Sequence, residues 1–244
     1  MSGLIAAGSI VLGPTGGGSS GPTTLPEYLA SIGKATWYGG FKAPNNLFSD
    51  ISNTVAVTTD GASWRNWLPS WTAGGFSASF GQSTGSRRCA LGTSRNDKPG
   101  AYGDGVDWYA TLSSTTELNR QYTILMSAWV TCAAGQPCLY SQNGNSVRYS
   151  CPASISGMPV FYGASGQLGV RANHVSQGTP VDASTFANRM GWSTHEGSTQ
   201  HYNTAPNLFR SSAATAYSAS TIHELWFVEK LTPEEITEAL KFLA

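Results

Sequence analysis

Residues 221–244, TIHELWFVEKLTPEEITEALKFLA, decide the fold. The first part, 221–229, is a short apolar run of the kind that forms a strand. The second part predicts a helix, because Thr232 is a good N-cap, Pro233 suits the first helical position and Glu235 completes a capping box. Apolar residues then recur at helical spacing, at Ile236, Ala239, Leu240 and Leu243. We therefore expect a short C-terminal helix that packs one stripe against a sheet or its edge.

Upstream of this stretch, short apolar runs alternate with turn residues. FSASF, 76–80, places apolar residues at every second position, which is the period of a half-buried strand. Asp60-Gly61 is a strong turn pair. Further strands are expected at 55–59, 106–112, 121–131, 138–142, 147–151, 159–163, 168–175, 189–194 and 199–203. Many short strands at this spacing predict an all-β sandwich or barrel.

The composition agrees with a β protein and limits the classes of partner that we expect it to bind. Of the 244 residues, only 11% are charged, and 14 Lys and Arg balance 14 Asp and Glu. Zero net charge removes the usual argument for nucleic-acid binding, which needs a basic surface. No apolar run approaches the roughly 20 residues that span a membrane. We therefore expect neither nucleic acid nor membrane as a partner.

The first 35 residues differ from the rest. An apolar head with Leu4, Ile5, Ile10, Val11 and Leu12 runs into a Gly/Ser/Pro linker, and 25–33 follows with one or two helical turns starting at Pro26. The head lacks a basic residue before Leu4 and is interrupted by glycine, so it is not expected to be a secretory signal. We divide the chain into an arm and linker, 1–35, and a sandwich domain, 36–244.

Three stretches together resemble the concanavalin A-like jelly-roll domains, of the laminin-G-like or lectin/glucanase type, found in bacteriophage virion proteins. Residues 45–70 resemble their opening segment, Gly103–Leu112 their Asp-Gly-x-Asp strand, and 224–243 their closing strand and terminal helix. The resemblance spans about 36–244. It implies two packed antiparallel sheets with an extended N-terminal arm and a short C-terminal helix. It carries over no ligand-binding residue.

The sequence offers no convincing catalytic or metal-binding set. Retaining glycosidases need two carboxylates facing one site, whereas Glu224 and Glu229 fall on opposite faces of a strand. Asp104 and Asp107 have the same problem and fit turn chemistry. The four histidines are scattered, so we interpret them as structural. We expect no enzyme activity, no cofactor and no metal.

The aromatic segment SWRNWLPSW is the most suggestive surface candidate. Exposed indoles of Trp64, Trp67 and Trp71 could stack on sugar rings, and Arg65 could donate to sugar hydroxyls. The alternative interpretation, which we favour, is that these tryptophans fill the core. A second open question concerns TCAAGQPC, in which a turn could bring Cys132 and Cys138 into a disulfide, with free thiols as the alternative.

The functional expectation is therefore a bacteriophage virion structural protein, a capsid decoration or tail appendage, made in the host cytoplasm. Residues 1–13 would dock on other virion subunits, for instance by adding 4–12 as a strand to a neighbouring sheet. We expect a homo-oligomer or several copies in one assembly. The alternative is a carbohydrate-binding module that attaches the particle to host surface glycans.

Overall fold

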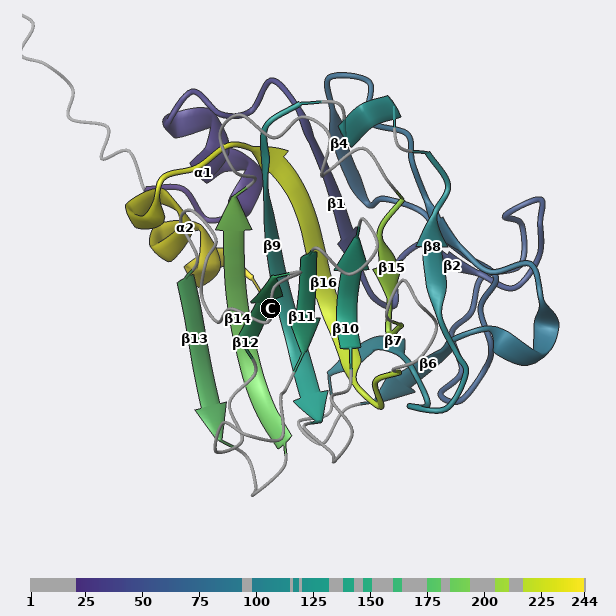
Figure 1. The fold of residues 1–244 in the computed structure, drawn as a ribbon. Helices are drawn as coiled ribbons and strands as arrows, with labels where there is room; N and C mark the ends of the chain where they lie inside the picture. The colour runs from purple at the N-terminus through teal and green to yellow at the C-terminus, as the bar shows by residue number, and fades with distance from the viewer. Residues whose placement is uncertain are drawn as a thin grey trace, which may run out of the picture.

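The computed structural model describes the larger part of the chain. The described residues are 21–93, 98–114, 116–118, 120–131, 138–142, 147–150, 160–163, 175–180, 185–193, 205–210 and 217–243. Their secondary structure is mostly β (Figure 1). Helices are short: α1 (Leu25–Ser31), α2 (Pro233–Ala239) and the 3-10 turns η1 (Gly85–Arg87), η2 (Thr116–Leu118) and η4 (Leu240–Phe242).

The strands form two eight-stranded sheets within the described residues, and every pairing between them is antiparallel. Sheet 1 has the order β13 (Val175–Pro180), β14 (Thr185–Ser193), β9 (Tyr122–Thr131), β16 (Thr221–Glu229), β1 (Tyr38–Lys42) and β4 (Trp71–Ala73). At one end β16 also pairs with β7 (Pro99–Tyr102), which pairs with β6 (Ala90–Thr93). Sheet 2 has the order β12 (Val160–Gly163), β11 (Val147–Ser150), β10 (Cys138–Gln142), β15 (Asn207–Leu208), β8 (Ala110–Leu112), β5 (Phe80–Gly81), β3 (Asn66–Trp67) and β2 (Leu47–Phe48). The predicted all-β, two-sheet antiparallel sandwich is confirmed.

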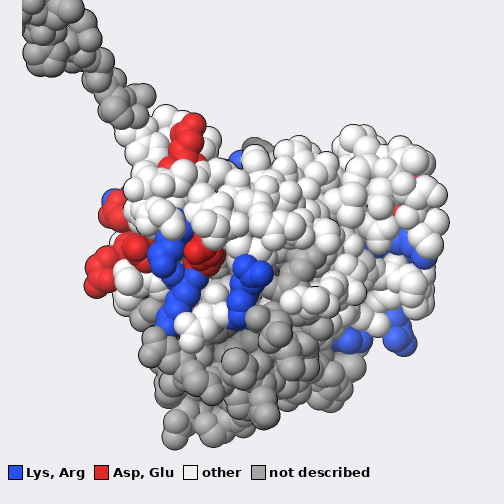
Figure 2. All heavy atoms as spheres, turned by 90° about the horizontal axis from the view of Figure 1, so that it is seen from above, with Lys and Arg blue, Asp and Glu red and all other residues white. Residues whose placement is uncertain are grey.

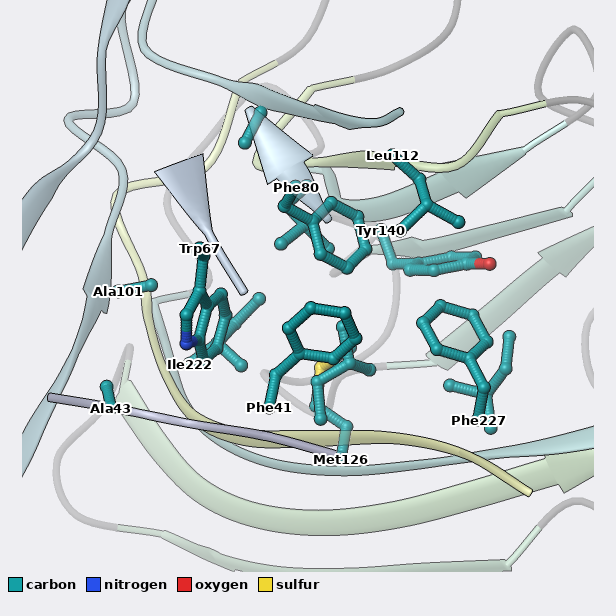
Figure 3. Close-up of a cluster of buried hydrophobic side chains, with 14 of the residues drawn as sticks. Phe41, Ala43, Trp67, Phe80, Ala101, Leu112, Met126, Tyr140, Ile222 and Phe227 are labelled. Atoms are coloured by element: carbon teal, nitrogen blue, oxygen red, sulfur yellow. The ribbon is translucent and has the colours of Figure 1, made fainter. Parts of the chain in front are cut away.

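The main core lies between the sheets and is unusually aromatic (Figure 3). Phe41 on β1 is its centre, with ring centroids 5.2 Å from Phe80, 5.5 Å from Trp67 and 6.3 Å from Phe227. All four side chains are fully buried. Edge-to-face packing of this kind adds to the free energy gained from burying apolar area, so this cluster ties sheet 1 to sheet 2.

A second core lies on the other face of sheet 1, under the two helices. Because side chains alternate along a strand, β16 sends Leu225 and Phe227 into the main core and Trp226 and Val228 outward. Helices α1 and α2 cover that outward face, lying near each other at one end of the sheet (Figure 1). The residues of the second core are Leu25, Tyr28, Leu29, Leu125, Trp226, Val228, Leu231, Ile236, Ala239, Leu240 and Leu243.

The C-terminal helix forms as its sequence predicts. Glu235 N donates to Thr232 Oγ1 at 3.3 Å, and Thr232 N donates to Glu235 Oε2 at 2.8 Å, which completes the capping box. Helix α1 has the same device at Thr24 and Glu27 and begins one residue before Pro26. Because α1 contributes to the second core, the folded body includes residues before 36, where we had placed its start.

Most strand predictions are confirmed, including 147–151 and 159–163, which match β11 and β12 within one residue, whereas 189–194 covers only the second half of β14. Predictions at 121–131, 138–142 and 221–229 match β9, β10 and β16 within one residue. In FSASF the burial alternates as predicted, but only its last residue, Phe80, belongs to a strand, because this segment crosses from β4 in sheet 1 to β5 in sheet 2.

Two other strand predictions are shortened by local turns. Residues 55–59 make only an isolated bridge from Ala56 to Phe48. The strand predicted at 106–112 begins at Ala110, since the Asp104 carboxylate accepts the backbone N–H groups of 106–108 and holds them in a turn. The strand predicted at 199–203, and all of 168–175 except Val175, lie outside the described residues.

Two adjacent glycines on β1 make room for the aromatic rings on both faces of sheet 1. A Cβ on Gly39 would lie 2.5 Å from Cγ of Phe76, and one on Gly40 would lie 2.6 Å from Cη2 of Trp226. These separations are far below van der Waals contact, and the neighbours are bulky core rings that cannot move aside. The GG pair is therefore required by packing rather than by a turn.

We expect Gly40→Ala to lower the free energy of unfolding by about 1–3 kcal/mol, because the methyl group overpacks a filled site. Urea unfolding followed by tryptophan fluorescence measures this change. Gly85→Ala is the matched control, since nothing lies within 4 Å of the added Cβ. The control should stay within about 0.5 kcal/mol of the native chain. Equal stability of the two variants would contradict the packing role of Gly40.

Candidate functional site

The structure divides the aromatic segment SWRNWLPSW between the two sheets. Trp67 belongs to β3 in sheet 2 and Trp71 to β4 in sheet 1, so the chain crosses between sheets at residues 68–70. Leu68 N donates to Asn46 O at 2.9 Å, and Ser70 N donates to Gly40 O at 2.6 Å, which fixes this crossing. The three tryptophans therefore do not share one surface.

The prediction that Trp64 and Trp67 could bind glycans is wrong, because both side chains are fully buried. Their rings meet edge to face at 6.1 Å, and Trp64 Nε1 donates to Ala90 O at 3.1 Å. A sugar cannot stack on an indole that has no exposed face. The core interpretation, which the sequence favoured, is the one that the structure supports for these two residues.

Arg65 lies between them in sequence and is half-buried. Its N–H donates to Phe48 O at 2.7 Å, and its carbonyl accepts from Gln82 N at 3.0 Å. These main-chain bonds tie Arg65 into sheet 2, away from the sheet that carries Trp71. Arg65 and Trp71 therefore cannot act together on one sugar ring.

Trp71 keeps its place as a candidate. It is 36% exposed, and its ring stacks on Trp226 with centroids 5.1 Å apart and an interplanar angle of 19°. Gly40 stands opposite both residues in the register of sheet 1, so the two indoles meet over a position without a side chain. Lys42 Nζ lies 6.0 Å from the centroid of Trp71 and provides a donor beside it.

A polar row continues from Lys42 across the outer face of sheet 1. Lys42 pairs with Glu224, Glu224 with Ser127, and Ser127 with Arg189, so these four side chains belong to one face. Glu224 is only 3% exposed. Its Oε1 accepts from Trp226 Nε1 at 3.0 Å, and its Oε2 lies 3.8 Å from Lys42 Nζ.

The exposed part of Trp71 together with Lys42 and Glu224 is the candidate site, which we call the Trp71 platform. An apolar ring face flanked by an ammonium group suits the apolar face and the hydroxyls of a sugar. Sequence reasoning missed Lys42, Glu224 and Trp226 because they come from strands far apart in the chain. Only the antiparallel register of β1, β4 and β16 brings them together.

Glu229 and Asp104, which we also considered, accept backbone N–H groups. Glu229 accepts from Thr36 N at 2.8 Å and from Trp37 N at 3.2 Å, whereas Glu224 holds an indole N–H on the opposite face of β16. Asp50 caps a turn through Thr54 N and Val55 N in the way Asp104 does. Across the described ranges, no group of three or more His, Cys, Asp or Glu residues could hold a metal ion.

His223 is a buried structural histidine, as we interpreted it. It is the extra residue in the bulge where β16 pairs with β9, and its Nδ1 lies 3.0 Å from the Pro99 carbonyl. Because a carbonyl only accepts, Nδ1 carries the proton. Burial lowers the pKa of His223, and the nearby charge of Lys98 lowers it further against the opposing effect of the Pro99 hydrogen bond.

Several predicted residues lie outside what the structure describes. They include the anchoring residues Leu4, Ile5, Ile10, Val11 and Leu12, the histidines at 174, 195 and 201, and Cys132. The predicted bridge from Cys132 to Cys138 therefore stays a prediction. Cys89 is a buried free cysteine, and burial raises the pKa of its thiol.

The described surface carries few charges. Figure 2 shows most of the visible acidic side chains at the end of the molecule that carries the helices, with basic side chains both beside them and at the opposite end, and mostly uncharged surface between. In the described part of the chain, no helix has the length and apolar character to cross a membrane.

Comparisons with known proteins leave the family open. No family model matches the chain, and no curated protein matches it. Among solved structures, a Trypanosoma rangeli sialidase in complex with the inhibitor DANA is similar at 11% identity and a TM-score of 0.41. The match covers 83% of this chain and 36% of the sialidase chain. At this distance the likeness carries no functional argument.

Stability should depend on pH through His223. A free histidine has a pKa near 6.5. Because the pKa of His223 is lowered in the folded chain, the unfolded chain binds more protons below about pH 6.5. The free energy of unfolding should therefore fall as pH drops from about 6.5, by at most about 1.4 kcal/mol per pH unit.

Urea unfolding between pH 5 and 8 measures this slope. His223→Asn keeps a donor for Pro99 O but cannot titrate, so its curve should be flatter by the contribution of His223. The other three histidines remain in both chains, and the difference isolates one residue. Identical slopes would show that His223 does not titrate on unfolding in this range.

Proposed function

We propose that this chain is a structural subunit of a bacteriophage virion, held in the particle by residues 1–13 and displaying its β-sandwich outward. The observation that carries the proposal is the position of the chain where it enters the folded body. Residues 21–24 are all exposed and lead directly into α1. A segment attached at this point can reach a neighbouring subunit without disturbing either core.

Helix α1, to which such an arm is attached, is packed firmly against the folded body. Leu25 and Leu29 are buried in the second core, Tyr28 stacks on Phe242 with centroids 5.2 Å apart, and the Tyr28 hydroxyl donates to Glu235 O at 3.2 Å. A force applied to the arm would therefore be transmitted through α1 to sheet 1 and α2. This arrangement suits a protein that bears load in an assembly made of several copies.

The resemblance to concanavalin A-like domains of virion proteins supports the same proposal from the sequence. Two packed antiparallel sheets with a capped terminal helix are the framework that this resemblance implies. The sparse charge of the described surface is compatible with a displayed, load-bearing role. Location on a capsid or a tail, after synthesis in the host cytoplasm, belongs to the proposal.

Deletion of residues 1–20 tests the anchor. The shortened chain keeps α1 and both cores, so its urea midpoint should match that of the full chain. We expect it to be absent from purified particles assembled with it in place of the full chain, as read by mass spectrometry. As a control, a chain with Gly16, Gly17 and Gly18 changed to serine keeps the head and should be incorporated. Full incorporation of the deleted chain would refute the anchoring role.

A second candidate function is attachment to host glycans, and the Trp71 platform favours it. The half-exposed indole is braced by Trp226, and Lys42 lies beside it at the edge of sheet 1. A braced aromatic ring loses little conformational freedom when a sugar stacks on it, which favours binding. The two functions are compatible, because the arm and the platform belong to different parts of the chain.

Screening the full chain on an array of neutral glycans tests this second function. For a glycan that binds, Trp71→Ala should weaken affinity by about tenfold, since an aromatic contact contributes about 1.5 kcal/mol. Ile51→Ala is the control, because Ile51 is an exposed apolar residue on a loop of sheet 2. No binding to any glycan, or equal loss in both variants, would remove glycan binding from consideration.

A further inference from the structure

A second polar cluster lies on the outer face of sheet 2, away from the Trp71 platform. Ala110 and Leu112 of β8 point into the main core, so Thr111 between them points outward. Its hydroxyl donates to Asn207 Oδ1 at 2.8 Å, and Arg210 Nη2 donates to the same oxygen at 3.1 Å. We call Tyr109, Gln82, Arg87, Asn207 and Arg210 the arginine cluster.

Tyr109 is the centre of the arginine cluster. The guanidinium carbon of Arg210 lies 3.5 Å from the centroid of its ring, which is close for a cation–π contact. Burial alone raises the pKa of Tyr109. Hydrogen bonds from Gln82, the charge of Arg210, and hydrogen bonds from Arg87 and Arg210 outweigh burial, so the pKa lies below its ordinary value. The backbone also joins Arg87 to the tyrosine, because Tyr109 N donates to Arg87 O at 3.2 Å.

The positive charge of this cluster has no counter-charge in the described part of the chain. Neither Arg87 nor Arg210 forms an ion pair with a described carboxylate. In addition, Arg210 Nε is buried and has no hydrogen-bond partner among the described atoms. Because Arg210 Nε is buried, a ligand would meet the cluster at the exposed Arg87. Two guanidinium groups near one oxygen repel each other, and an anion beside Arg87 would reduce that repulsion.

The cluster is held in place and can be reached from solvent. Gln82 is 7% exposed and its Oε1 accepts from Thr84 N at 3.0 Å, while Asn207 is also 7% exposed. The carbonyl of Arg210 accepts from Ser141 Oγ at 2.6 Å, which anchors the backbone on β10. Arg87 is exposed and Tyr109 is half-buried. The buried Gln82 and Asn207 therefore form a fixed base for the cluster, and the exposed Arg87 places a positive charge at the surface.

We propose that the arginine cluster binds a singly charged oxyanion, the carboxylate or sulfate group of an acidic sugar. Guanidinium groups match the oxygens of such groups with paired hydrogen bonds, and the ring of Tyr109 supplies an apolar wall for the sugar. Gln82 and Asn207 hold the donors in position. This site consists of residues separate from those of the Trp71 platform, and the proposal does not depend on the proposed virion role.

Titration of the full chain followed by NMR tests the site. The probes are sodium D-glucuronate, sodium sulfate and neutral methyl glucoside, with sodium chloride keeping the ionic strength constant. We expect saturable shifts of the Arg210 Nε–H resonance with glucuronate and none with methyl glucoside. Tighter binding of glucuronate than of sulfate supports recognition of an acidic sugar. Equal binding of the two would reduce the site to one for free anions and overturn the sugar part of the proposal.

Arg87→Gln removes an exposed cation of the cluster and should weaken glucuronate binding at least about tenfold, the scale of one charge-assisted hydrogen bond. Arg120→Gln is the matched control, because Arg120 is likewise an exposed arginine, but it lies over Trp37, 4.5 Å from the ring centroid, outside the cluster. The control should bind as the native chain does. No saturable shift with glucuronate, or equal weakening in both variants, would overturn the proposal.

Discussion

The fold depends on one strand that is buried on both faces. Eight of the nine residues of β16 are buried, and it pairs with β1 and β9 along most of its length. Phe227 on one face joins the two sheets, and Trp226 on the other joins sheet 1 to its helices. A strand that serves two cores tolerates little change, which explains why its neighbour β1 carries glycines where the largest rings lie.

The candidate platform follows from the same constraint. Trp226 is large enough to extend over Gly40, and its outer ring face supports Trp71 from the edge strand β4. The indole N–H must be satisfied in a buried place, and the Glu224 carboxylate does this at 3.0 Å. Lys42 then lies near that carboxylate. A packing requirement thus produces a surface with an aromatic ring and a charged neighbour at the edge of sheet 1.

The two outer faces differ in how their charges are matched. On sheet 1, Lys42 is paired with Glu224. On sheet 2, the guanidinium groups near Tyr109 gather around a phenol oxygen and a buried amide, with no described carboxylate beside them. The chain has equal numbers of acidic and basic residues, so its net charge of zero does not reveal this local excess of positive charge on sheet 2. The Trp71 platform and the arginine cluster therefore lie on separate surfaces of the same sandwich.

The sequence by itself determined the β class, the capped C-terminal helix and the positions of β9, β10 and β16, because each depends on local patterns. Period-two burial in 76–80 and the capping box at Thr232 and Glu235 are read from neighbouring residues. Only the tertiary structure decided which tryptophans are exposed, which face Glu224 shares with Lys42, and which arginines meet at Tyr109. Those contacts join residues far apart in the chain, and they depend on strand register and on where the chain changes sheets, which local patterns do not encode.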